Sequence, residues 1–242
     1  MSPMILITGA SRGIGLAAAK FILADGAKVI ALQRTIIPAL EALSTKYPGA
    51  IQIIKGDFTK PEDISSALAS LAGDSLDAVV LNAAVGEPFG TIATMPLDSF
   101  RVIFDVNFFG VVQFLQLALP KLREAKGKVV FVSSTAGEIG AKGLGAYGAS
   151  KAALNQLNRT LAVEEPDITS IAFHPGVVRT EMAAAIQRDG KDHMDPAVVG
   201  MLAATASETD VPGRGIRNLV LRAETEYSGK YLYFDDPLVT SL

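Results

Sequence analysis

The chain has 242 residues, of which 49% are hydrophobic and 19% are charged, and its formal net charge is -3. This composition provides for a large apolar core, excludes a disordered chain and disfavours a surface that binds nucleic acid. Cysteine is absent, which excludes disulfides, thiolate metal sites and a cysteine nucleophile, and two histidines leave little for any other metal site. We therefore expect no metal and no nucleic-acid partner.

The sequence gives no sign of membrane insertion. No uninterrupted apolar run approaches the ~18 residues that a membrane-spanning helix needs. The apolar opening, residues 4–8, runs directly into a glycine-rich turn and lacks the basic segment that begins a signal peptide. We expect a soluble, cytoplasmic protein with no membrane partner.

Short apolar runs rich in β-branched residues alternate with longer segments typical of helices. The runs are apolar on both faces, which is typical of parallel strands covered on both sides. The predicted strands are residues 5–7, 29–32, 51–54, 78–81, 129–132, 168–173 and 231–234. The predicted helices are residues 14–24, 38–47, 61–72, 97–125, 146–164, 196–207 and 214–223. The pattern predicts an α/β fold: a single doubly wound Rossmann-type domain over residues 1–242, with a seven-stranded parallel sheet flanked by helices on both faces.

A glycine-rich turn joins the first predicted strand to the first predicted helix. Gly9, Gly13 and Gly15 follow the spacing G-x-x-x-G-x-G, and a side chain at these positions would block close approach of a phosphate to the backbone. Free N–H groups at the start of the helix can bind that phosphate, so the turn predicts a dinucleotide site. The alternative is a glycine-rich turn without a ligand.

The residue after the second strand bears on which dinucleotide binds. A carboxylate there accepts from the ribose 2′-hydroxyl of NAD, whereas an arginine accommodates the 2′-phosphate of NADP. Here Arg34 ends the strand, and Arg12 in the glycine turn can approach the same phosphate. Asp57, after the third strand, can accept from the adenine amino group. The alternative is that both arginines are solvated surface residues.

A candidate catalytic pair is Tyr147 and Lys151, which share one face of a predicted helix one turn apart. A phenol has a pKa of about 10, and a nearby cation is expected to lower it by about 1–3 units. Such a phenol can donate a proton to a carbonyl oxygen. Ser134 can hold the same oxygen, and Asn107 can anchor a water that relays protons to Lys151. On its own, Tyr-x-x-x-Lys is more often an ordinary helix pair.

Over nearly its full length the sequence resembles the short-chain dehydrogenase/reductase family. The matching features are the Thr8–Gly15 turn, Asn82-Ala83-Ala84, Asn107, Ser134, Tyr147, Lys151 and Pro175-Gly176 followed by Thr180. The resemblance implies an Asn107–Ser134–Tyr147–Lys151 tetrad and hydride transfer from the nicotinamide. It also implies that Asn82 stabilises the central strand, that Lys151 binds the nicotinamide ribose, and that Val178 and Thr180 contact the carboxamide.

NADP(H) is the cofactor that the arginine pair and the resemblance together imply. The residues expected to contact it are Gly9, Ser11, Arg12, Gly13, Ile14, Gly15, Arg34, Asp57, Phe58, Asn82, Ala83, Ala84, Tyr147, Lys151, Pro175, Gly176, Val178 and Thr180. The family usually has glycine where this chain has Ala84, so we expect a slightly displaced turn there. More narrowly, residues 130–134, 145–155 and 231–238 are similar to fungal benzil-reductase-like enzymes, which are related to the sepiapterin reductases.

Substrate contacts are expected from mostly apolar side chains. The candidates are Glu138, Ile139, Leu144, Val177 and Met182, with Glu87, Phe89, Ile186 and Met194 nearby. Residues 176–195 lack regular periodicity, so we expect a substrate lid at about 177–210. The alternative is that the apolar lid residues simply pack on the core. We expect His174 to be structural and His193 to be solvated.

The sequence therefore predicts NADPH-dependent reduction of a small, largely apolar ketone, diketone or aldehyde, with Tyr147 as the general acid. One alternative is an alcohol-oxidising dehydrogenase of a biosynthetic pathway, and another is a catalytically silent NADPH-binding regulator. Residues 97–125 and 146–164 carry apolar residues on more than one face, and the family pairs these helices across a twofold axis. The expected partners are thus a small carbonyl or alcohol substrate and further copies of the chain, as a homodimer or homotetramer.

Overall fold

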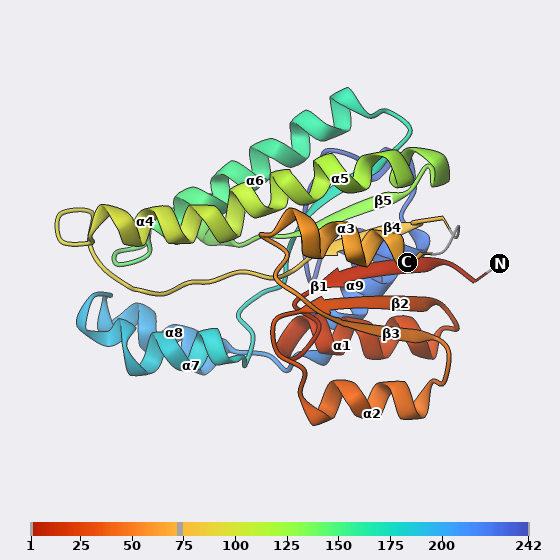
Figure 1. The fold of residues 1–242 in the computed structure, drawn as a ribbon. Helices are drawn as coiled ribbons and strands as arrows, with labels where there is room; N and C mark the ends of the chain where they lie inside the picture. The colour runs from red at the N-terminus through yellow and green to blue at the C-terminus, as the bar shows by residue number, and fades with distance from the viewer. Residues whose placement is uncertain (1, 72–74, 242) are drawn as a thin grey trace.

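The computed structural model describes residues 2–71 and 75–241, and its centre is a parallel sheet (Figure 1). The sheet has seven strands in the order β3-β2-β1-β4-β5-β6-β7. The strands are β1 (Met4–Thr8), β2 (Lys28–Gln33), β3 (Ile51–Lys55), β4 (Ala78–Leu81), β5 (Lys128–Val132), β6 (Thr169–His174) and β7 (Tyr231–Tyr233). Because every pairing is parallel, all seven carboxyl ends lie at one edge. The predicted fold class is confirmed.

Helices cover both faces of the sheet, as Figure 1 shows. The α-helices are α1 (Gly13–Ala24), α2 (Pro38–Lys46), α3 (Pro61–Ala69), α4 (Leu97–Phe104), α5 (Gly110–Ala125), α6 (Gly145–Glu164), α7 (Glu181–Arg188), α8 (Pro196–Thr205), α9 (Asp210–Arg222) and α10 (Pro237–Thr240). Short turns η2 (Thr135–Gly137), η3 (Gly190–Asp192) and η4 (Thr225–Tyr227) are 3-10 helices. One apolar core lies beneath α1, α2 and α9, and a second lies beneath α3, α5 and α6.

Strand order reverses between β1 and β4, which are neighbours although β2 and β3 lie between them in the chain. In open α/β sheets, ligands bind outside the carboxyl ends of the strands at such a reversal. Ile7 pairs with Val80 there, so the glycine-rich turn after β1 and the segment after β4 emerge side by side. The fold thus places the predicted dinucleotide site where the topology favours one.

Two predicted elements differ from the structure. The helix predicted over residues 97–125 is interrupted by a π-helical turn, η1 (Asp105–Phe109), in which each N–H bonds one residue further back than in an α-helix. The stretch 176–195, predicted to be irregular, contains α7 and η3. The alanines at positions 183–185 are good helix formers, but they give no apolar periodicity that would predict the helix. Other helix ends differ by a few residues, and Ala72, the predicted end of the third helix, lies outside the described residues.

The helical run Leu97–Ala125 is, by length and composition alone, apolar enough to cross a membrane, with a mean hydropathy of 1.7. Core helices of proteins that never meet a membrane pass the same test. Several of its side chains, among them Ile103, Phe114 and Leu122, are fully buried in this structure. The run therefore packs as a core helix on the sheet.

Helices α1 and α9 approach each other closely at Gly213. A Cβ atom on Gly213 would lie 2.8 Å from the Ala17 side chain and 3.0 Å from its backbone carbon. Since the backbone of α1 cannot yield without moving the helix, a methyl group there would force the two helices apart.

We expect Gly213→Ala to lower the free energy of unfolding by about 1–3 kcal/mol, measured by urea denaturation. Gly200→Ala is the matched control, because no atom lies within 4 Å of the added methyl group. It should leave stability unchanged or raise it by about 0.4–1 kcal/mol, through a less flexible unfolded chain. Equal destabilisation by the two variants would contradict the packing described for α1 and α9.

Candidate active site

Asn82, directly after β4, ties the end of β1 to the start of the glycine-rich turn. Its side-chain amide donates to the carbonyl oxygens of Thr8 at 3.0 Å and Gly9 at 3.1 Å. The Thr8 hydroxyl accepts from the main-chain N–H groups of Asn82 and Ala83, both at 3.1 Å. These four bonds fix the glycine-rich turn against the segment after β4, across the reversal point of the sheet.

The start of α1 has the features of an anion site. No side chain caps this helix and its first turn holds no acidic residue, so its first N–H groups keep their hydrogen-bonding capacity. Gly9 has a φ of +70° and Gly15 is so close to the turn that a Cβ would lie 2.4 Å from the Gly9 carbonyl oxygen. The backbone here can therefore meet a phosphate directly, and the residues present fit the pyrophosphate of a dinucleotide.

The end of β2 lies beside this turn, because Gly9 N–H donates to the Leu32 carbonyl oxygen at 2.9 Å. Arg12 and Arg34 are both exposed to solvent. Partial burial alone would raise the pKa of Asp57, but two hydrogen bonds from Thr59 and the positive charges of Arg34 and Lys60 hold that pKa below its usual value. Arg34 and Asp57 thus share one neighbourhood, as predicted.

Phe58 has a different position from the one expected of a cofactor contact. Its side chain is 7% exposed and belongs to the apolar core beneath α3 and α5. A Cβ on Gly110 would lie 3.1 Å from its ring, which shows how closely α5 covers it. The Phe58 side chain is therefore a core residue, which leaves its main chain to face the adenosine region.

Ser134 and Tyr147 come together from two elements. Ser134 follows β5 and caps η2, where its Oγ accepts from Ala136 N–H at 3.2 Å. Tyr147 lies in the first turn of α6, and its hydroxyl interacts with the Ser134 hydroxyl. Burial raises the pKa of Tyr147 to about 12, with the Ser134 interaction opposing the rise. The predicted lowering of this pKa is wrong for the chain itself, because the loss of solvent raises the pKa by more than the Ser134 interaction lowers it.

Lys151 lies inside the protein, with only 3% of its surface exposed. Its Nζ donates to the Val132 carbonyl oxygen at 2.7 Å and lies 5.6 Å from the centre of the Tyr147 ring. Burial lowers the pKa of Lys151 to about 8. The ammonium is thus held at a fixed point between the end of β5 and the tyrosine, as the helical spacing predicted.

Asn107 occupies the π-helical turn and is almost completely buried. Its Oδ1 accepts from Val85 N–H, and its Nδ2 donates to the Val85 carbonyl oxygen and to Ser150 Oγ, at 2.9, 2.9 and 3.1 Å. Ser150 in turn donates to the Tyr147 carbonyl oxygen at 2.7 Å. Both amide hydrogens are therefore used within the protein, and the side chain connects the segment after β4 to the turn of α6 that carries Tyr147.

The turn after β6 connects the sheet to the lid. Gly176 has a φ of +79°, and a Cβ there would lie 2.8 Å from the Phe234 ring. Thr180 caps α7 by accepting from Ala183 N–H at 3.4 Å. Its methyl group lies against Gly13, where a Cβ would approach it to 3.3 Å. The start of the lid helix thus rests on the glycine-rich turn.

The comparisons with known proteins agree with this geometry. A family model described as short chain dehydrogenase matches residues 3–191. The chain belongs to the short-chain dehydrogenase/reductase family. It is 45% identical, over 77% of its length and 75% of the relative's, to an uncharacterized oxidoreductase of Schizosaccharomyces pombe. It is 34% identical to a benzil reductase ((S)-benzoin forming) of Saccharomyces cerevisiae, over 98% and 97% of the two chains.

A solved structure shows the same family fold. The crystal structure of a short-chain dehydrogenase/reductase from Saccharomyces cerevisiae superposes with a TM-score of 0.93 at 32% identity and covers 99% of each chain. The likeness to a benzil reductase is the narrower resemblance that the sequence indicated. The chain is therefore an oxidoreductase of the short-chain family.

The predicted substrate residues differ in their packing, exposure and hydrogen bonding. Met182 packs against Gly86, and Leu144 and Ile186 pack on a small apolar cluster formed by Phe89, Ala185 and Met194. This cluster is separate from the two cores on the sheet, so contact of Ile186 and Met194 with a substrate stays a prediction. Ile139 is 66% exposed, and the Val177 carbonyl oxygen accepts from Ser207. Glu138 accepts from the Tyr233 hydroxyl at 2.8 Å.

Sequence reasoning missed several residues that build this site. Thr8, Val85, Ser150 and Tyr233 make the hydrogen bonds that hold the predicted residues in place. Ser150 lies within the Tyr-x-x-x-Lys segment, and Thr8 directly precedes the first glycine. Both residues therefore lie in or beside motifs that the sequence shows. Their hydrogen-bond partners are distant in the chain, because Asn107 is 43 positions from Ser150 and Asn82 is 74 positions from Thr8.

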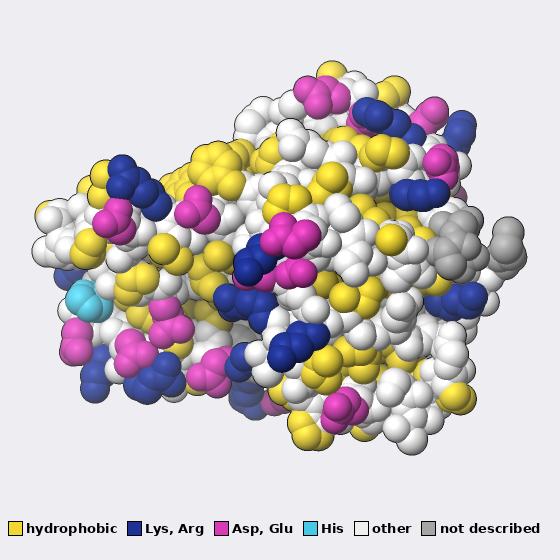
Figure 2. Space-filling view, in the orientation of Figure 1, with side chains coloured by type: hydrophobic (Ala, Val, Ile, Leu, Met, Phe, Trp, Pro, Cys, Tyr) yellow, Lys and Arg dark blue, Asp and Glu magenta, His cyan; other side chains and the backbone are white. Residues whose placement is uncertain are grey.

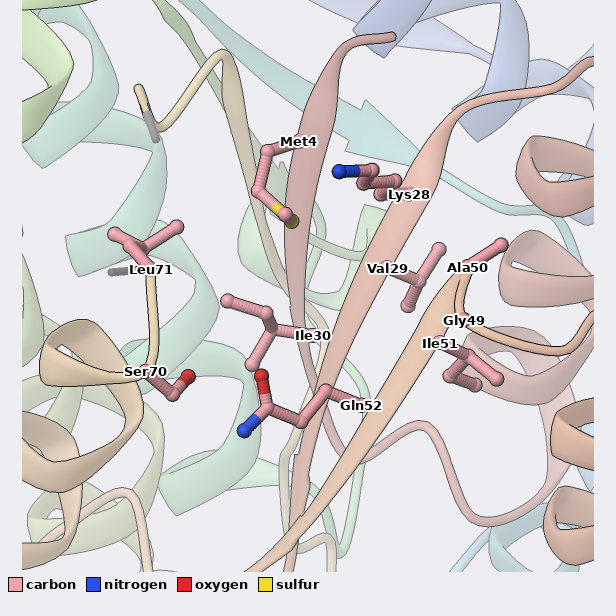
Figure 3. A pocket seen from close by; sticks show the side chains of 10 residues that line it. All are labelled: Met4, Lys28, Val29, Ile30, Gly49, Ala50, Ile51, Gln52, Ser70 and Leu71. Atoms are coloured by element: carbon pink, nitrogen blue, oxygen red, sulfur yellow. The ribbon is translucent and has the colours of Figure 1, made fainter. Parts of the chain in front are cut away.

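A hollow of about 190 Å³ lies at the opposite, amino end of β1–β3 (Figure 3). The residues that line it include Met4, Lys28, Gln52 and Leu71. The predicted catalytic residues lie at the other edge of the sheet. Among residues 2–71 and 75–241, no group of three or more His, Asp or Glu side chains could hold a metal ion.

The buried ammonium of Lys151 makes stability depend on pH. The folded protein binds fewer protons than the unfolded chain between the folded pKa of about 8 and the ordinary lysine pKa of 10.5, so stability rises with pH across that window. At pH 7, below the folded pKa, the wild type bears the full free-energy cost of burying the Lys151 ammonium. We expect Lys151→Met to be more stable than the wild type at pH 7, and the difference to shrink by about 2–3 kcal/mol near pH 10.5, measured by urea denaturation. A pH-independent difference would contradict the burial of a charged Lys151.

Proposed function

We propose that this enzyme reduces a small, largely apolar ketone, diketone or aldehyde to the alcohol with NADPH. The observation that carries the proposal is the meeting of the Ser134 and Tyr147 hydroxyls at the carboxyl edge of the sheet, with the Lys151 ammonium beneath the tyrosine ring. The similarity to a benzil reductase supports an activated carbonyl as the substrate class.

Ser134 has the hydrogen-bonding capacity to orient a carbonyl group. A hydroxyl offers one donor and two acceptor positions. In this structure one acceptor position takes the Ala136 N–H and another is available to Tyr147. The hydroxyl hydrogen then remains for the oxygen of a substrate carbonyl, which would lie between Ser134 and Tyr147.

Tyr147 acts as the general acid in this proposal. With a pKa of about 12 its phenol keeps the proton at neutral pH, which is the form an acid needs. When bound, NADPH would supply the hydride for the carbonyl carbon. The electron pair of the C=O bond moves to oxygen and takes the Tyr147 proton, giving the alcohol. Lys151 lies near enough to stabilise the phenolate that remains, and Asn107 and Ser150 hold the helix turn that carries the phenol.

The preference for NADPH over NADH rests on Arg34 and Arg12. Both side chains are exposed beside the glycine-rich turn, and β2 ends without a carboxylate that would accept from a ribose hydroxyl. A guanidinium matches the geometry of a 2′-phosphate. Lys151, Val178 and Thr180 are proposed to contact the nicotinamide half, Asn82 to hold the cofactor-facing turn, and the apolar lid around Met182 to cover the substrate.

We also propose that the enzyme works as a homodimer or homotetramer in the cytoplasm. Hydrophobic side chains gather over α4 and α5 in Figure 2. Val102 and Phe109 on that run, and Val163 on α6, are 53%, 57% and 81% exposed. A second copy covering these helices would remove their apolar side chains from water.

Replacing the proposed acid tests the reaction. Tyr147→Phe removes the proton donor, so kcat for benzil reduction with NADPH should fall by about 10²–10⁴-fold. NADPH binding, followed by fluorescence titration, should change little, because the ring remains. Tyr47→Phe, at the end of α2, is the control and should keep full activity. Retention of most of the rate by Tyr147→Phe would show that another group donates the proton.

Reversing the charge at Arg34 tests the choice of cofactor. Arg34→Asp removes a charge-assisted contact with the 2′-phosphate, so kcat/KM for NADPH relative to NADH should fall about ten- to a hundredfold. Lys126→Asp makes the same change of charge at the far end of α5 and should leave the ratio intact. An unchanged ratio in Arg34→Asp would remove Arg34 from the cofactor site.

A further inference from the structure

The short turn η2 directly follows Ser134 and is held at both ends by residues of β6 and β7, the two strands that follow β5 in the sheet. At its start, the Thr135 N–H donates to His174 Nδ1 at 3.3 Å. Directly after its end, the Glu138 carboxylate accepts from the Tyr233 hydroxyl at 2.8 Å. His174 is the last residue of β6 and pairs with Tyr233 of β7. Two neighbouring strands therefore hold one turn.

His174 and Tyr233 are themselves fixed against each other. Their rings make an edge contact with centres 5.3 Å apart, and His174 is only 9% exposed. The backbone bond from Thr135 constrains the peptide that joins Ser134 to the turn. A change at His174 would therefore alter where Ser134 points, without touching a substrate.

We propose that His174 is a positioning residue for Ser134, with the Glu138–Tyr233 hydrogen bond holding the far end of the same turn. This role rests on the proposed function where it is tested by kcat, and on the structure alone where it is tested by amide NMR. Ser134 has to meet the same carbonyl oxygen as Tyr147, so a shift of the turn would slow the chemical step more than it would weaken cofactor binding.

The contact requires a neutral imidazole, because Nδ1 accepts only when it carries no proton. Burial lowers the pKa of His174, while the negative charges of Glu138 and Asp235 oppose that lowering. Tyr233 is the other titratable side chain in ring contact with it. The ring is thus neutral and accepting at neutral pH, and protonation at acid pH removes the acceptor from Thr135.

Two substitutions at His174 separate positioning from general packing. His174→Leu removes the acceptor, whereas His174→Asn keeps an acceptor oxygen at the position equivalent to Nδ1. With NADPH and benzil at pH 7.5, kcat of His174→Leu should fall about tenfold, the effect of one lost hydrogen bond, with KM for NADPH little changed. His174→Asn should recover most of kcat and lose the acid limb of the wild-type pH profile. His193→Asn, which removes the other histidine, should keep that limb.

Amide NMR of the wild type tests the same contact without turnover. The Thr135 amide signal should titrate together with the His174 ring, and it should lose this titration in His174→Asn. A wild type without carbonyl reductase activity would contradict the proposed function, and the NMR result would still decide the positioning role. An active wild type with equal kcat in His174→Leu, or a Thr135 amide that ignores the His174 titration, would overturn the role of His174.

Discussion

Parallel pairing of the strands is the constraint on which the rest of the structure depends. Because β1, β4, β5 and β6 all run the same way, the glycine-rich turn, Asn82, Ser134 and His174 emerge at one edge from positions far apart in the chain. The Asn82 and Thr8 hydrogen bonds then fix the first two of these segments to each other. Helix α6 contributes Tyr147 and Lys151 to the same site.

The site keeps its charged and polar groups in environments that cost stability. Lys151 is almost entirely buried, and its ammonium donates to the Val132 carbonyl oxygen. An ammonium taken out of water is expensive, and this is typical of functional sites. The same burial raises the pKa of Tyr147 and lowers the pKa of Lys151. It therefore keeps the phenol protonated and makes the lysine easier to deprotonate. Asn107, inside the π-helical turn, stabilises the arrangement through Val85 and Ser150.

The sequence was sufficient to predict the sheet, the glycine-rich turn and the close approach of Tyr147 to Lys151, because each depends on local periodicity or spacing. It could not predict the π-helical turn at Asp105–Phe109, where Asn107 makes hydrogen bonds to residues 22 and 43 positions away. The sign of the Tyr147 pKa shift was wrong because helical spacing shows the cation but not the depth of burial. Only packing reveals that the Phe58 side chain lies in the core, and its contact with the cofactor stays a prediction.

Isotope transfer tests the central claim most directly, that a nicotinamide hydride and a protein proton meet on one carbonyl group. Benzil is reduced in ordinary water with NADPH carrying deuterium at the transferable C4 position, and the alcohol is examined by mass spectrometry and NMR. We expect one deuterium on the former carbonyl carbon. An alcohol whose carbon carries hydrogen from the solvent, or the absence of any alcohol, would contradict it.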